Sequence, residues 1–142
     1  MKAAIIPIQS ITDIITNSST EVFLLNLEDA EQFEKDYDYR KGYFDEFKTI
    51  EDVRKYVEKD DCEELDAFME YNPYCSWNAG NVISVMKEKA NKTDDQIWDF
   101  FKDLYVGLVG KAILVCDNCW DMCNEIRDWC EKNKKPYKEA GL

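Results

Sequence analysis

The stretch "EVFLLNL", from Glu21 to Leu27, is the segment of this chain that says most about its fold. Four apolar residues, Val22 to Leu25, follow one another in it. An almost continuous apolar run of this length is typical of a strand that is buried on both faces. The rest of the chain should therefore supply neighbouring strands and helices that cover both sides.

Two further segments have the pattern of strands. "KAILVCDN", from Lys111 to Asn118, is apolar between its polar ends and predicts a second buried strand. "AAIIPIQSI", residues 3–11, is apolar but contains Pro7, which predicts an edge strand because proline has no N–H to donate to a ladder.

The remaining segments favour helices. Thr49 precedes the acids Glu51 and Asp52 and predicts a helix start, and Thr93 with Gln96 forms the sequence of a capping box. Helices are expected over residues 27–37, 49–59, 60–72, 81–90, 93–108 and 119–133, and residues 134–142 are expected to form a loose tail. We therefore expect a single α+β domain over residues 1–142, with a small mixed sheet of about three strands packed with four to six helices.

Length and composition are those of an ordinary one-domain protein. The chain has 142 residues, of which 45% are hydrophobic, so it can bury a normal core without metals or disulfides. No run approaches the roughly 18 apolar residues that cross a bilayer, and the opening residues lack the features of a signal peptide. A cytoplasmic protein without membrane contact is expected, with its six cysteines as reduced thiols.

The chain contains no histidine, which excludes Ser-His and Cys-His nucleophile pairs and histidine-containing zinc sites. The glycines form no phosphate-binding loop, and no segment has the spacing of a calcium loop. We expect neither a cofactor nor a metal, and a non-enzymatic role is favoured over catalysis.

Negative charge is concentrated in the middle of the chain. The net charge is −12, and residues 28–75 alone contain 17 acids and 7 bases, a balance of −10. A chain of this charge is not expected to bind nucleic acid directly. The densest group of acids is the predicted partner-binding set: Asp60, Asp61, Glu63, Glu64, Asp66 and Glu70.

These acids admit three interpretations: a solvated helix face, a cation site, or a surface that imitates nucleic-acid phosphates. A row of carboxylates with only Lys59 to offset it suits the third interpretation, because it complements a basic groove and gives fast, salt-sensitive association.

Cys116 and Cys119 form a CxxC sequence where the second buried strand is expected to meet a helix. A helix N-terminus lowers the pKa of a thiol, so this pair is a candidate thiol-disulfide oxidoreductase site. However, Cys119, Cys123 and Cys130 share one helical stripe with Ile126, and thiols in such a stripe act as small apolar core residues. The structural interpretation is favoured.

A polar run, Thr16-Asn17-Ser18-Ser19-Thr20, precedes the buried strand. Its side chains suit a turn, and a serine-rich stretch in this place is also a candidate modification or processing site. With Phe23 after it, the run resembles the N-terminal "TNSSS..F" signature of uncharacterised bacterial and phage proteins, although Thr20 ends the serine run and two residues precede Phe23. The resemblance covers about a tenth of the chain and implies no activity.

Charge and resemblance together favour an acidic, phage-derived interaction protein. Its expected partner is a basic protein that handles nucleic acid, such as a host defence nuclease, which it would inhibit as a nucleic-acid mimic. The alternatives are the oxidoreductase that uses Cys116 and Cys119 and a structural or scaffold component of a virion or other assembly.

Overall fold

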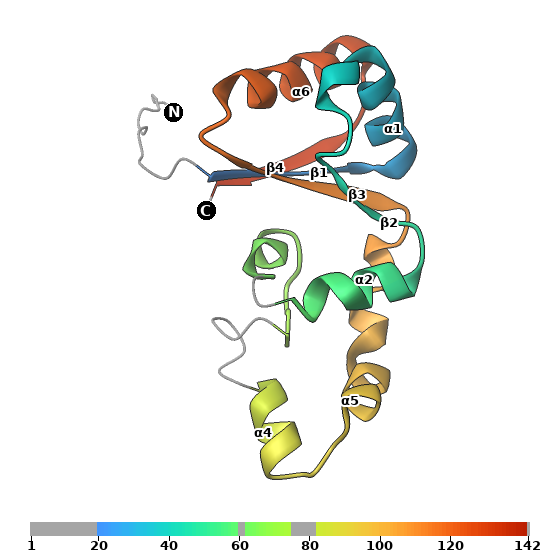
Figure 1. The fold of residues 1–142 in the computed structure, drawn as a ribbon, viewed down its shortest axis with the longest axis vertical. Helices are drawn as coiled ribbons and strands as arrows, with labels where there is room; N and C mark the ends of the chain where they lie inside the picture. The colour runs from blue at the N-terminus through green and yellow to red at the C-terminus, as the bar shows by residue number, and fades with distance from the viewer. Residues whose placement is uncertain (1–19, 60–61, 75–81, 142) are drawn as a thin grey trace.

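A four-stranded antiparallel sheet lies at the centre of the computed structural model, which describes residues 20–59, 62–74 and 82–141 (Figure 1). The strands are β1 (Thr20–Asn26), β2 (Asp45–Phe47), β3 (Lys111–Asp117) and β4 (Tyr137–Gly141), and their order across the sheet is β2-β3-β1-β4. All three pairings are antiparallel.

The central position of β1 explains its apolar sequence. Phe23 lies opposite Leu114 of β3, and Leu24 lies opposite Ile113 of β3 and Lys138 of β4. Phe23 and Leu25 pack into the core on one face of the sheet, and Val22 and Leu24 pack into the core on the other. The predictions of two buried strands in these segments are therefore confirmed.

Helices α1 (Leu27–Asp36) and α6 (Trp120–Asn133) cover one face of the sheet and form what we call the upper layer (Figure 1). Phe33 of α1 packs against Trp129 of α6 with a ring-centroid distance of 5.8 Å. The stripe predicted in α6 is confirmed, since Cys123, Ile126 and Cys130 are buried.

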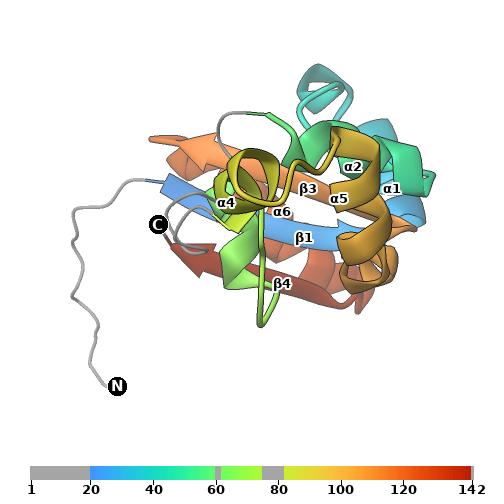
Figure 2. The same cartoon turned by 90° about the horizontal axis from the view of Figure 1, so that it is seen from below.

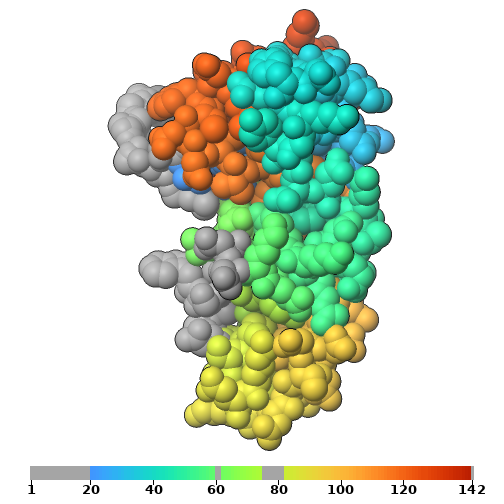
Figure 3. Space-filling view, viewed as in Figure 1, coloured from blue at the N-terminus to red at the C-terminus, as the bar shows by residue number. Residues whose placement is uncertain are grey.

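The lower layer lies on the other face and contains α2 (Ile50–Val57), the 3₁₀-helix η2 (Glu63–Ala67) and α5 (Asp94–Phe101), with α4 (Val82–Glu88) packed on α5 farther from the sheet (Figure 1). The predicted helix starts at Thr49 and Thr93 are both confirmed as capping boxes, in which each threonine side chain accepts a bond from the backbone three residues later. Figure 2 shows α2 and α5 in front of β3 and β1, whereas β4 runs along the margin. In Figure 3 the upper layer stands at one end of the molecule and α4 and α5 at the other.

Two predicted helices are shorter than their sequence patterns indicate. The helix expected over 60–72 is the five-residue η2 in the described part, and the helix expected over 93–108 ends at Phe101 and continues as two short 3₁₀-turns. Beyond Phe101 the apolar residues Tyr105 and Leu108 are still buried, but the chain carries them in 3₁₀ form and leaves Leu104 exposed. Apolar spacing thus indicates a helical turn without deciding between its α and 3₁₀ forms.

The expected loose tail is wrong for Tyr137–Gly141, because these residues form β4 and pair with β1. Helix α6 ends at Asn133 and is capped by Lys134, whose left-handed conformation (φ 57°) allows the N–H of Lys135 to donate to Cys130 O at 2.8 Å and turns the chain back toward the sheet.

The α+β class is confirmed, with four strands in place of about three, antiparallel pairs in place of a mixed sheet, and five α-helices in the described residues. The strand expected over residues 3–11 and the polar run before Thr20 lie outside the described residues. No described helix combines the length and the apolar character needed to cross a bilayer.

Candidate functional site: an acidic cleft on the lower face

The four predicted partner-binding acids that the structure describes do not form one continuous helix face. Asp60 and Asp61 lie outside the described residues, and Glu63, Glu64 and Asp66 belong to η2. Glu63 is exposed, whereas Glu64 and Asp66 are half-buried.

Glu70 lies apart from these acids. It is exposed and lines a different hollow at the β4 margin of the sheet. The 3₁₀-helix η2 ends at Ala67, so Glu70 lies beyond it and the four described acids do not share one α-helical face.

The structure instead gathers acids from three elements around one hollow of about 380 Å³, which we call the acidic cleft. Its acids come from β2, η2 and the end of β3, which are far apart in the sequence. The residues that line it are Asp45, Tyr56, Lys59, Glu63, Glu64, Val115 and Asp117.

Hydrogen bonds fix part of this cleft. The hydroxyl of Tyr56 donates to Glu64, and burial together with that bond raises the pKa of Tyr56 far above its usual range. The phenol therefore stays protonated and holds Glu64 in place. Across the cleft, Thr20 Oγ1 donates to Asp117 Oδ1 at 2.5 Å.

One cation lies among these described lining residues. Lys59 Nζ is 3.9 Å from Asp45 Oδ1 and 4.7 Å from the centre of the Tyr56 ring. Both charged side chains of this ion pair are more than half exposed, so the pair is weak and can exchange partners. Four carboxylates against one ammonium leave the cleft with a formal charge of −3.

This arrangement suits a positively charged side chain better than a metal ion. In the part of the chain that the structure describes, no group of three or more histidine, cysteine or acidic residues is placed to hold a metal. The half-exposed Val115 adds an apolar contact at the cleft, and an arginine or lysine has both a charge for the carboxylates and an apolar stem for such a surface.

The predicted redox pair, Cys116 and Cys119, is in a different environment from that of a reactive dithiol. Cys116 is 1% exposed, and burial raises the pKa of its thiol far above the usual range, with neighbouring Cys123 raising it further. Cys119 is half-buried, and its thiol donates to Asp117 O at 3.1 Å. Cys116 interacts with Cys123 of α6, and both thiols belong to the same apolar core.

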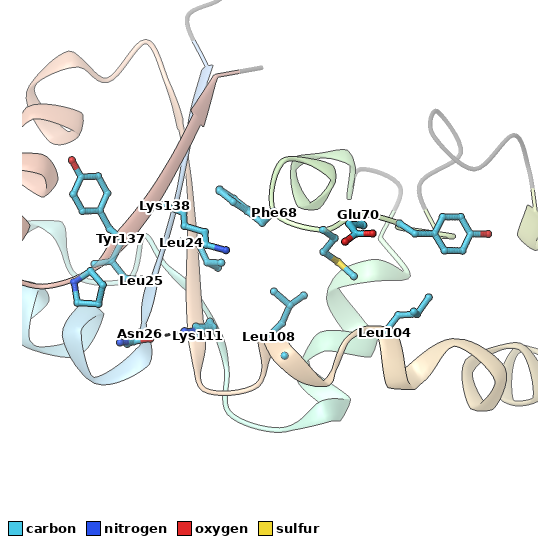
Figure 4. Close-up of a pocket in the computed structure, with 14 residues that line it drawn as sticks. Leu24, Leu25, Asn26, Phe68, Glu70, Leu104, Leu108, Lys111, Tyr137 and Lys138 are labelled. Carbon is cyan, nitrogen blue, oxygen red and sulfur yellow. Dashed lines mark hydrogen bonds between the residues drawn. The ribbon is translucent and has the colours of Figure 1, made fainter.

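A larger hollow of about 750 Å³ lies under β1 and β4 on the same lower face, and we call it the apolar cleft (Figure 4). Its lining contains mainly apolar side chains from β1, from the segment after η2 and from the region between α5 and β3. Nothing in the sequence pattern indicated it.

Sequence reasoning also missed four members of the acidic cleft: Asp45, Tyr56, Val115 and Asp117. Asp45 and Asp117 line the same hollow because β2 pairs with β3, although Asp45 lies opposite Ile113, four residues before Asp117, and β2 is only three residues long. A strand so short has no periodicity to detect, so no local signal could have found this grouping.

Comparison with protein-family models, with curated proteins and with solved structures finds no match for this chain.

Proposed function

We propose that this protein is a non-enzymatic binding module whose acidic cleft receives a basic side chain of a partner protein. The observation that carries the proposal is the convergence of Asp45, Glu63, Glu64 and Asp117 from separate elements on one concave site with Lys59 as its described cation. A solvated acidic surface needs no such convergence, because scattered exposed acids give the same solubility.

The cleft favours arginine or lysine on a protein over free nucleic acid, because its carboxylates repel phosphates. Partners with many exposed basic residues are typically proteins that bind nucleic acid, and the surrounding charge of −12 would steer them toward this surface. Association should therefore be fast at low salt and should weaken steeply as salt screens the charges. A nucleic-acid-handling partner, such as a defence nuclease, fits this description.

The test compares two charge reversals of equal size. Asp45→Lys with Glu63→Lys changes the acidic cleft, whereas Asp128→Lys with Glu131→Lys changes exposed acids of α6 in the upper layer by the same net charge. Each immobilised variant and the wild type are incubated with a nuclease-treated bacterial lysate, eluted in salt steps and analysed by mass spectrometry.

We expect the wild type and the α6 variant to retain the same basic proteins, and the acidic-cleft variant to lose most of them. Equal loss from both variants would mean that net charge alone attracts these proteins. Unchanged recovery on the acidic-cleft variant would remove the cleft from the binding surface.

A further inference from the structure

The apolar cleft is a built hollow in the lower layer. On its sheet side lie Leu24 and Lys138, and across it lie Phe68 and Leu108 (Figure 4). Leu104 lines it from the segment after α5. Its volume of about 750 Å³ falls in the range of sites that hold small organic ligands, roughly 300–1,000 Å³.

Several of its apolar side chains remain open to solvent. Phe68 and Met69 are half-buried, Tyr71 is 41% exposed and Leu104 is 45% exposed. Single exposed apolar residues are common on protein surfaces, but several that line one concavity are typical of a binding site for an apolar ligand or partner.

The charged groups of the apolar cleft are mainly cations, in contrast to the protein as a whole. Lys111 and Lys138 line it with one acid, Glu70. Lys111 Nζ donates to Asn26 Oδ1 at 2.7 Å, and neither lysine forms an ion pair with any described residue.

Lys138 is placed by the strand register. It lies opposite Leu24 in the pairing of β4 with β1, so it shares the lower face with that leucine. Its neighbour Glu139 points to the other face, where it pairs with Arg127 of α6. A cation without a carboxylate partner, set beside apolar side chains in a chain of charge −12, favours an anionic group with an apolar tail.

We propose that the apolar cleft binds a small amphiphilic anion, namely an aliphatic carboxylate of the fatty-acid type. Its chain lies on Leu24, Phe68, Met69, Leu104 and Leu108, and its carboxylate pairs with the ammonium of Lys138. The inference does not rest on the proposed function, because the acidic cleft lies on the β2 side of the sheet and shares no lining residue with this one.

The test uses decanoate as the probe and isothermal titration calorimetry with the full chain, below the concentration at which decanoate forms micelles. We expect saturable binding of one decanoate, with decyltrimethylammonium at least about tenfold weaker, which corresponds to about 1.4 kcal/mol. Lys138→Met keeps the apolar stem and removes the charge, so it should weaken decanoate about tenfold and leave the neutral decanol unchanged.

Two matched control variants test whether decanoate binds in the apolar cleft. Lys132→Met removes an exposed lysine of α6 and should not alter decanoate binding, whereas Leu104→Glu should abolish it. Phe100→Glu introduces the same charge at a 72% exposed residue that does not line the cleft, and it should bind as the wild type does.

Absent binding, a preference for the cationic amphiphile, or equal affinity in Lys138→Met would overturn the proposal. Sedimentation of the same variants covers the other occupant of an apolar surface: if Leu104→Glu converts a dimer to a monomer, the cleft is an interface between copies and the proposal is wrong.

Discussion

The two layers that cover the sheet differ in how completely they do so. In the upper layer, α1 and α6 lie directly on the sheet (Figure 1), and Phe33, Trp129 and Ile126 are buried in the core between them. In the lower layer, short elements cover β3 and β1 but leave the two margins of the sheet open, and both clefts lie there. One face thus carries a closed core, whereas the other combines a core with two open hollows.

The largest expected effect tests this difference with phenylalanine truncations. Phe33→Ala should lower the free energy of unfolding by about 3–5 kcal/mol, because the ring is fully buried and contacts Tyr37, Phe44 and Trp129. Phe68→Ala, at the half-buried wall of the apolar cleft, should cost only about 1 kcal/mol. Denaturant titrations followed by circular dichroism measure both, and similar losses would contradict the contrast between layers.

Thiol labelling sharpens the comparison within the upper layer. Cys116, Cys123 and Cys130 are buried and burial raises the pKa of each thiol, that of Cys130 to about 11. At pH 8 with iodoacetamide they should react roughly a hundredfold more slowly in the folded protein than after denaturation. Peptide mass spectrometry gives the labelling rate of each cysteine, and rapid labelling of Cys116 in the folded protein would support the oxidoreductase alternative.

A buried hydrogen bond in the lower layer gives a smaller effect. Tyr105 Oη donates to Asn72 Oδ1 at 2.5 Å, and Asn72 Nδ2 donates to Cys62 O at 3.2 Å. Tyr105→Phe leaves the buried amide oxygen without this donor and should cost about 1–3 kcal/mol. Tyr39→Phe removes a solvent-exposed bond to Glu125 and is the matched control, with an expected change below about 0.5 kcal/mol.

The smallest expected effect is a pH-dependent change in the free energy of unfolding that arises at the edge of the upper layer. Burial, followed by the neighbouring Glu139, raises the pKa of Glu21, while Arg127 opposes the shift. Stability from protonated Glu21 is present below its unfolded pKa and is lost as pH rises through the folded value. Glu21→Gln should therefore stabilise the protein at pH 7, by no more than about 1 kcal/mol because the group is partly solvated, and the gain should vanish near pH 4.

Glu125→Gln is the control, and its effect on stability should have the opposite sign to that of Glu21→Gln. A hydrogen bond from Arg40 lowers the pKa of Glu125, so its contribution is present at pH 7 and is lost as pH falls through the folded pKa. Thermal melts at both pH values check the pair, and a destabilising Glu21→Gln at pH 7 would contradict the assignment.

Local patterns were sufficient to predict the elements that carry their own signals. Residues close together in the sequence predict three of these features: the apolar run of β1, the helix starts at Thr49 and Thr93, and the cysteine stripe of α6. Local sequence does not predict strands β2 and β4, because "DEF" and "YKEAG" have few apolar residues. These segments become strands only by pairing with β3 and β1.

The candidate site was predicted to a lesser extent for the same reason. The abundance of acid around Glu63 and Glu64 is visible in the sequence, but whether Asp45 and Asp117 line the same hollow as these acids depends on which strands pair. The apolar cleft could not be predicted for a further reason. It opens near the point where α5 ends, at Phe101, whereas the apolar periodicity in the sequence continues past that residue.

The place of β1 in the sheet also determines when the protein can fold during synthesis. Both neighbours of this strand, β3 and β4, are made more than 80 residues after it. At ribosomal speeds the apolar side chains of Val22 to Leu25 wait on the order of ten seconds for β4. Strand β1 therefore has no neighbour to pair with until β3 has been made, and the sheet is complete only after residues 137–141 have emerged. Until then the nascent chain presents a strand edge that chaperones and other unfinished chains can bind.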